Sequence, residues 1–187
     1  MVSAQSSLSC GMLSLSTTDL GGSEPKKLDK TQHYEATTEQ VWDMLLNTDF
    51  VEKKLQAAGA TDSSAETMRE GDATTLVSRR VLPADLPSFV RKFTGDELTL
   101  IETQRWQDPD GDTRSADFIV DFGDHPISLK GKIKIEPDDD GTKVHTTGQV
   151  KCTVPFAGGK IESVAVEWTE KYLDKENQVG TEWLSDD

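Results

Sequence analysis

The histidines of this 187-residue chain are too widely spread to predict a catalytic or metal centre. His33, His125 and His145 fall on three separate segments, and their spacing is not that of metal ligands. His125 precedes a proline in a turn and His145 falls on the polar phase of an alternating segment, so we expect both at the surface. The sequence has no readable Ser–His–acid arrangement, glycine-rich phosphate loop or helical metal motif. We therefore predict no metal ion, no cofactor and no catalytic group.

Four charged residues within predicted strands are the next candidates for chemistry: Arg79, Arg80, Glu102 and Arg105. We predict that they face outward and form charge pairs between strands. The alternative is a reversal of the pleat that turns one of them inward, where an arginine would clamp a ligand carboxylate. An enzyme built this way would need an inward acid or base, for which Glu102, Arg79 and Tyr172 are the candidates.

The charge of the chain limits its partners. There are 34 Asp and Glu residues against 20 Lys and Arg residues, a formal net charge of −14, which repels nucleic acid and favours a basic partner protein if there is a protein partner. The acidic runs at residues 108–112, 138–140 and 186–187 are predicted to be solvated turns and a tail. The first of them lacks the later glutamate of a calcium-binding loop.

Cysteine content and hydropathy indicate a reducing compartment and no membrane span. The two cysteines, Cys10 and Cys152, allow neither a disulfide framework nor a paired-cysteine zinc motif. No apolar run approaches about 18 residues, and the first residues lack the pattern of a signal peptide. We therefore expect a cytoplasmic protein.

The beginning of the chain predicts an extension, a strand and two short helices. Residues 1–29 are rich in Ser, Thr and Gly without periodicity and are predicted to be a flexible extension, which leaves one domain over residues 30–187. A short strand over residues 30–35 comes first. The cap-type residues 37–40 then open one helix, and residues 47–49 interrupt it and open a second over residues 50–58.

The middle of the chain predicts antiparallel strands separated by turns. Alternation and turn residues place strands over residues 65–70, 73–82, 97–107, 113–122, 127–136 and 143–154. Pro83 and Pro87 force an irregular excursion with about one helical turn over residues 86–93. Gly131 and Gly148 fall on apolar strand faces, where they permit either the close approach of a helix or ligand, or a bulge.

Residues 154–184 predict one long amphipathic helix entered through Pro155 and the glycine pair at 158–159. Its apolar positions recur at steps of three, four and seven: Ile161, Val164, Ala165, Trp168, Tyr172, Val179 and Trp183. This helix is the only predicted element large enough to cover the sheet. Segregated helices and a meandering sheet define an α+β domain rather than a parallel doubly wound one.

Four stretches carry a family resemblance: residues 36–42 (ATTEQVW), 48–52 (TDFVE), 79–87 (RRVLPADLP) and 154–162 (VPFAGGKIE). With the order of elements, they make residues 30–184 resemble the START-like, helix-grip superfamily, and within it an uncharacterised, largely actinobacterial family of unknown function. The resemblance implies a curved antiparallel sheet of about seven strands wrapped around the last helix, with a cavity between them. Such folds are similar to lipid carriers, hormone receptors, polyketide cyclases and chaperone activators alike, so the fold does not select among them.

The implied cavity gives a ligand-binding prediction, since ligand pockets are mostly apolar with a few polar groups. We expect it to be bordered by Val77, Val81, Leu98, Leu100, Phe118, Val120, Ile133, Val150, Val164, Trp168 and Tyr172. Plain core packing would use the same residue types.

The leading hypothesis is a non-catalytic carrier or sensor that holds a hydrophobic small molecule, such as a lipid, a fatty acid or a polyketide-like compound, by desolvation and shape. One alternative is a cyclase, dehydratase or hydrolase acting in the same cavity. The other is an interaction domain with a filled core whose acidic surface binds a basic partner protein.

Overall fold

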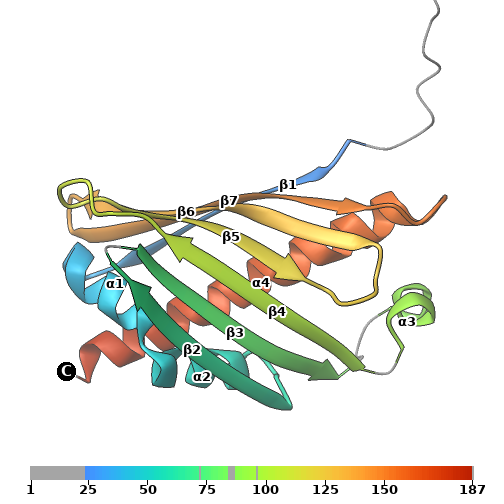
Figure 1. The fold of residues 1–187 in the computed structure, drawn as a ribbon, viewed down its shortest axis with the longest axis horizontal. Helices are drawn as coiled ribbons and strands as arrows, with labels where there is room; N and C mark the ends of the chain where they lie inside the picture. Colours follow the sequence, from blue (N-terminus) through green and yellow to red (C-terminus); the bar gives the residue numbers. More distant parts are fainter. Residues whose placement is uncertain (1–23, 72, 84–86, 96, 187) are drawn as a thin grey trace, which may run out of the picture.

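The computed structural model describes residues 24–71, 73–83, 87–95 and 97–186, and within them the chain forms one seven-stranded antiparallel sheet and four helices (Figure 1). The strands are β1 (Lys26–Tyr34), β2 (Asp62–Glu70), β3 (Ala73–Pro83), β4 (Glu97–Trp106), β5 (Arg114–Asp121), β6 (Ile127–Asp138) and β7 (Gly141–Cys152). The helices are α1 (Thr38–Leu46), α2 (Thr48–Ala57), α3 (Ser88–Thr94) and α4 (Gly158–Ser185). The predicted α+β helix-grip class is confirmed.

The sheet follows the chain order except at one end. Strands β2 to β6 each pair with the next along the chain, whereas β1 pairs with β7. Strand β1 begins at Lys26, opposite Val150, so it starts before the predicted strand and takes in residues 26–29 of the predicted extension. The rest of that predicted extension, residues 1–23, lies outside the described residues.

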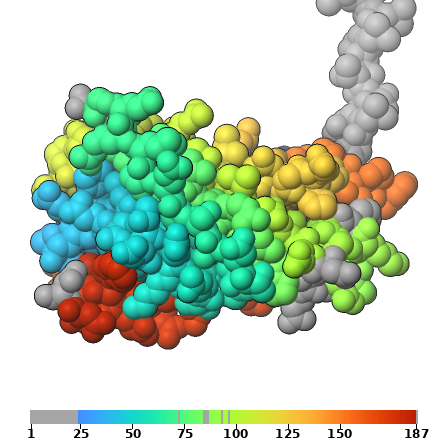
Figure 2. Space-filling model, turned by 60° about the horizontal axis from the view of Figure 1, so that its bottom comes forward, coloured from blue at the N-terminus to red at the C-terminus, as the bar shows by residue number. Residues whose placement is uncertain are grey.

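The two short helices form where the cap residues predicted them. Thr37 accepts a hydrogen bond from the Gln40 backbone N–H, and the Gln40 side chain accepts one from the Thr37 backbone N–H, which is a capping box. Asn47 ends α1 and caps α2, because its Oδ1 accepts from the backbone N–H groups of Asp49 and Phe50. Helices α1 and α2 lie against the C-terminal turns of α4, which are red in Figure 2. Helix α3 lies at the opposite end of the molecule from α1 (Figure 1).

Alternation along the strands builds the core between the sheet and α4. The fully buried side chains include Leu28, Leu76, Ile135, Val144 and Val150 from the strands and Val41, Phe50, Val51 and Leu55 from α1 and α2. Helix α4 runs along the whole sheet and buries Ile161, Leu173 and Val179 against it (Figure 1). Burying a side chain of this size stabilises the fold by roughly 1.5–3 kcal/mol before the loss of conformational entropy is counted.

Helix α4 begins at Gly158 rather than at the predicted residue 154. Residues 155–157 form a turn in which Phe156, fully exposed, has a positive φ of 60°. A Cβ on Gly158 would lie 2.7 Å from the Cys152 carbonyl oxygen, so the absence of a side chain lets the helix start against the end of β7.

Gly131 and Gly148 lie opposite each other on β6 and β7. A Cβ on Gly131 would lie 1.9 Å from the Thr147 carbonyl oxygen and 2.8 Å from a ring carbon of Phe118. The position is therefore glycine because neighbouring sheet atoms come close, and neither glycine lines the interior cavities described below.

Candidate functional site

A largely apolar cavity of about 310 Å³ lies between the sheet and the first half of α4. Its wall is drawn from α3, α4 and four strands. The lining side chains include Leu82, Val90, Leu98, Leu100, Val120, Phe122, Ile127, Leu129, Ile161, Val164, Ala165 and Trp168. The volume lies at the lower end of the range of small-molecule sites. We call this space the apolar chamber.

A second, smaller cavity of about 30 Å³ continues toward the middle of α4 and is markedly more polar. It has room for roughly one or two water molecules. Its polar lining residues are Arg80, Glu102, Gln104, Thr146, Thr169, Tyr172 and Glu176. Five residues line both cavities and form the boundary between the apolar chamber and this polar chamber: Arg80, Val120, Leu129, Thr169 and Tyr172.

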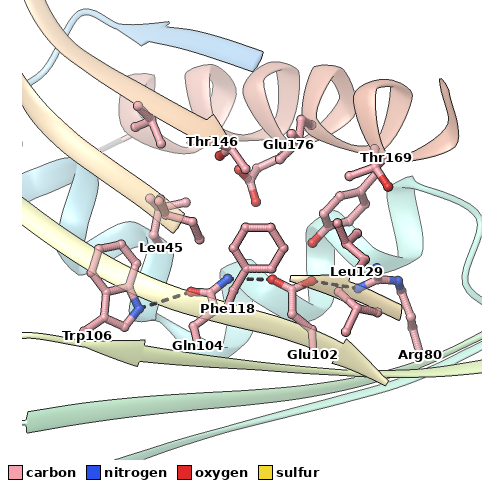
Figure 3. A pocket seen from close by; sticks show the side chains of 15 residues that line it. Leu45, Arg80, Glu102, Gln104, Trp106, Phe118, Leu129, Thr146, Thr169 and Glu176 are labelled. Carbon is pink, nitrogen blue, oxygen red and sulfur yellow. Dashed lines mark hydrogen bonds and ion pairs between the residues drawn. The ribbon is translucent and has the colours of Figure 1, made fainter. Parts of the chain in front are cut away.

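A chain of hydrogen bonds along β4 forms the sheet side of the polar chamber (Figure 3). Trp106 Nε1 donates to Gln104 Oε1 at 3.1 Å, and Gln104 Nε2 donates to Glu102 Oε1 at 2.8 Å. Arg80 Nη1 on β3 donates to Glu102 Oε2 at 3.2 Å. Glu102, Gln104 and Trp106 follow one another on the inner face of β4, since side chains two residues apart share a face. Both carboxylate oxygens of Glu102 are thus hydrogen-bonded.

A second polar cluster faces the first from the helix side. Glu176 on α4 points into the polar chamber (Figure 3), and its Oε2 forms an ion pair with Lys54 of α2. Its Oε1 accepts from Gln32 Nε2 on β1 at 3.0 Å, and the same nitrogen donates to the Leu173 carbonyl oxygen at 2.9 Å. The Arg80 guanidinium lies 4.6 Å from the ring centroid of Tyr172, which places a cation on an aromatic face. Lys54, Arg80, Glu102 and Glu176 are all buried.

Neighbouring charges keep Glu102 and Lys54 ionised. Burial alone would raise the pKa of the Glu102 carboxyl, but Arg80, Lys54 and the bond from Gln104 bring that pKa below its usual 4.5. Burial alone would lower the pKa of Lys54, but Glu176, Tyr172 and Glu102 carry it upward. Burial raises the pKa of the Tyr172 phenol to about 12, with Lys54 opposing the shift. At neutral pH Glu102 is therefore an anion, Lys54 a cation and Tyr172 a neutral hydroxyl.

Most of the eleven side chains predicted to border a cavity lie at one of the two chambers. Leu98, Leu100, Val120, Val164, Trp168 and Tyr172 line the apolar chamber. Phe118 and Ile133 line the polar one. Val81 and Val150 are buried but line neither. Val77 is half-buried, out of phase with the inward Leu76 and Ser78, and pairs with Thr103.

The prediction that the four charged strand residues all face outward was wrong for two of them. Arg79 is outward and pairs with Asp62 at 2.5 Å, and Arg105 is exposed, but Arg80 and Glu102 are inward and buried. No reversal of the pleat is needed, because Arg80 follows Leu76 and Ser78 on the same face of β3. The inner face of β3 is half polar, so its apolar residues could not reveal its phase.

Sequence reasoning also missed Lys54, Glu176 and Gln32. A signal existed for the first two. Lys54 lies on the same helical face as Phe50, Val51 and Leu55, at the spacing of three and four residues that defines a buried stripe. Glu176 fills the gap in the apolar arc of α4 between Tyr172 and Val179. A charged residue within a buried stripe usually has a buried partner of opposite charge, and here Lys54 and Glu176 pair with each other.

Among the described residues, the histidines and the cysteine outside the two chambers form no catalytic or metal-binding cluster. His33 lies 3.1 Å from Asp138 and His145 2.9 Å from Asp29 at the surface. Across the described ranges no three His, Cys, Asp or Glu side chains come together as a set of metal ligands. Cys152 is a buried free thiol, and Cys10 lies outside the described residues. In the same part of the chain, no helix has both the length and the apolar character to span a bilayer.

The fold is START-like, and solved structures agree. A START superfamily protein from Mycobacterium smegmatis is similar with a TM-score of 0.55 and 16% identity, over 84% of this chain and 98% of that one. Human STARD10 is similar with a TM-score of 0.59 and 11% identity, over 85% of this chain and 64% of that one. A protein from Thermus thermophilus, TTHA0849, has a TM-score of 0.56 and 20% identity, over 84% of this chain and 95% of that one. At these identities the likeness is one of fold.

The chain belongs to the family described as "Protein of unknown function (DUF2505)", whose model matches residues 29–184. An uncharacterized protein of Mycobacterium tuberculosis is 19% identical over 170 residues, which is 86% of this chain and 98% of that protein. The family resemblance predicted from the sequence is thus confirmed, and the resemblance to the START-like superfamily is confirmed at the level of the fold.

Proposed function

We propose that the protein binds a hydrophobic small molecule, such as a lipid or a polyketide-like compound, in the apolar chamber and acts as its carrier or sensor. The observation that carries this proposal is the chamber itself, about 310 Å³ walled mainly by aliphatic and aromatic side chains. An apolar molecule that enters an apolar space leaves water, which lowers the free energy by roughly 25 cal/mol per Å² of apolar area buried. The binding of a hydrophobic ligand therefore needs no bond chemistry.

The pKa shifts of the groups in the polar chamber argue for binding rather than catalysis. A general acid or base works best with a pKa near the working pH. The neighbours of Glu102 move its pKa below the usual value, and burial moves that of Tyr172 to about 12, so both move away from neutrality. The cavity also does not fit the filled core on which the protein-interaction alternative depends.

Ligand recovery from the native host tests the proposal. Protein purified from its own host under mild conditions is compared by native mass spectrometry before and after solvent extraction. We expect a mass excess that is released as an apolar compound. Repeated recovery of protein without any such compound would argue against a carrier.

A blocking variant locates the compound. Ala165→Phe places a ring in the apolar chamber, whereas Ala57→Phe makes the same change at an exposed position of α2. The first variant is expected to lose the mass excess and the second to keep it. Retention of the ligand by Ala165→Phe would place binding elsewhere.

A further inference from the structure

We propose that the cavity selects an apolar molecule whose polar group carries no charge, such as a hydroxyl, ketone or ester, and rejects the carboxylate of a fatty acid. This inference rests on the proposed function, because it specifies the ligand of the same site. The specificity comes from the balance of charge that the folded protein already has around the chamber.

The buried charges at the chamber cancel one another. Arg80 is paired with Glu102 at 3.2 Å, and Lys54 is paired with Glu176. Two cations and two anions therefore face each other from β3, β4, α2 and α4, and each is 8% exposed or less. The positive charge of Arg80, which the sequence offered as a clamp for a carboxylate, is already matched by an anion of the protein.

The other charged groups near the cavities do not change this balance. Lys171 borders the apolar chamber, but it is exposed and its Nζ bonds Glu167 at 2.7 Å. Glu162 is fully buried near the start of α4, where its Oε1 accepts from the Cys152 backbone N–H at 2.8 Å, and it lines neither chamber. Among the described residues, each cation that lines the two chambers already has an anionic partner.

A ligand carboxylate would therefore enter as an uncompensated buried charge. An unpaired charge in a low-dielectric interior carries a large desolvation penalty, which is repaid only by a partner of opposite charge. The carboxylate would have to displace Glu102 from Arg80 and leave that glutamate unpaired instead. Either outcome opposes binding.

A neutral polar group meets no such penalty and finds hydrogen-bonding atoms at the boundary of the chambers. A guanidinium has five N–H donors in a planar fork, and within the described residues Arg80 uses Nη1 for Glu102. The Tyr172 phenol, which stays protonated, can both donate and accept. A hydroxyl or carbonyl oxygen at this boundary would leave the rest of the ligand in the apolar chamber.

The test compares two probes that share a ten-carbon chain. Binding of 1-decanol and of decanoate to the wild-type protein is measured by isothermal titration calorimetry at pH 7.5. We expect 1-decanol to bind at least tenfold more tightly than decanoate. Equal or tighter binding of decanoate would overturn the inference while supporting the proposed function, whereas no binding of either probe would overturn both.

A charge-switch variant tests the cause. Glu102→Gln removes one buried anion and leaves Arg80 unmatched, so we expect decanoate to bind at least tenfold more tightly to it than to the wild type. Asp62→Asn is the matched control. Asp62 is the exposed ion-pair partner of Arg79, so this variant also removes one anion, but at the surface. That control should behave as the wild type does. A folded Glu102→Gln protein that binds decanoate no more tightly than the wild type would overturn the inference. If this variant does not fold, the comparison of the two probes on the wild-type protein decides whether the inference holds.

Discussion

The buried ion pair between Lys54 and Glu176 joins α2 to α4, and its two side chains are only 3% and 7% exposed. Removing one partner leaves the other charged and buried, which typically costs about 3–5 kcal/mol. We expect Lys54→Met to lower the free energy of unfolding, measured in urea, by that amount. The double variant Lys54→Met/Glu176→Leu should recover most of the loss.

An exposed ion pair provides the comparison. Lys171 Nζ and Glu167 Oε1 lie 2.7 Å apart, but the two side chains are 69% and 61% exposed. Pairs in such positions contribute about 0–1 kcal/mol, so Lys171→Met should leave the unfolding free energy within about 1 kcal/mol of the wild type. A similar loss in Lys171→Met and Lys54→Met would show that burial is not the cause.

Glu102 should also make stability depend on pH. Its pKa is lower in the folded protein than its usual 4.5, so its contribution is complete above that value and is lost as the pH falls through the folded pKa. Glu102→Gln lacks this contribution at every pH. We therefore expect the difference in unfolding free energy between wild type and Glu102→Gln to be large at pH 7 and to narrow below about pH 4.5. A difference that is constant from about pH 7 to about pH 3 would contradict the assignment.

At the scale of elements, Gly180 decides how closely α4 packs. A Cβ there would lie 2.7 Å from a ring carbon of Tyr34 on β1 and 3.1 Å from the end of Met44 on α1. Alanine gains about 1 kcal/mol over glycine in a helix, but overpacking costs about 1–3 kcal/mol. We expect Gly180→Ala to lower the unfolding free energy by about 1 kcal/mol, measured by urea denaturation.

The next residue of α4 is the control. Thr181 is exposed, so Thr181→Ala should change stability by no more than about 0.5 kcal/mol. If Gly180→Ala proved more stable than the wild type, the close contact with Tyr34 would not limit the helix position.

The elements could be predicted from the sequence more completely than their inner faces. Cap residues at Thr37 and Asn47 and strict alternation in β6 each have a local physical cause, so their signals survive in a single sequence. The phase of β3 could not be read, because Arg80 and Ser78 face inward and Val77 does not. The reason is that Arg80 is satisfied by Glu102 on the neighbouring strand β4, and the register that brings the two together is not readable from β3 alone.

At the scale of the whole molecule, the net charge of −14 should oppose compactness. Salt screens repulsion between exposed charges, with a Debye length of about 10 Å at 0.1 M and about 3 Å at 1 M. We expect the unfolding free energy to rise by on the order of 1 kcal/mol between about 10 mM and about 500 mM NaCl. The same rise in KCl would exclude specific binding of Na⁺. A fall in the unfolding free energy with added salt would instead show that attractive ion pairs dominate.

The architecture of the whole molecule could be predicted, but the cavity volume could not. Two-residue alternation followed by one long amphipathic helix determines which surfaces must meet. A cavity is the space that side chains leave unfilled, and it depends on how Trp168, Phe122 and Val90 orient against one another. Sequence reasoning therefore found part of its apolar wall, such as Leu98 and Trp168, but missed the ionic clusters at its boundary.

The pairing of β1 with β7 has a consequence for biosynthesis. Tyr34 lies opposite Thr142, roughly a hundred residues later in the chain, and β7 is the neighbour of β1 in the described sheet. Closing so long a loop slows folding more than it lowers the stability of the folded protein, because the entropic cost of closure grows only with the logarithm of the loop length. While the ribosome is still making the second half of the protein, Leu28 and Tyr34 have no strand to join. The β1 segment of the nascent chain therefore stays unpaired, and accessible to chaperones and to other chains, until almost the whole domain has emerged.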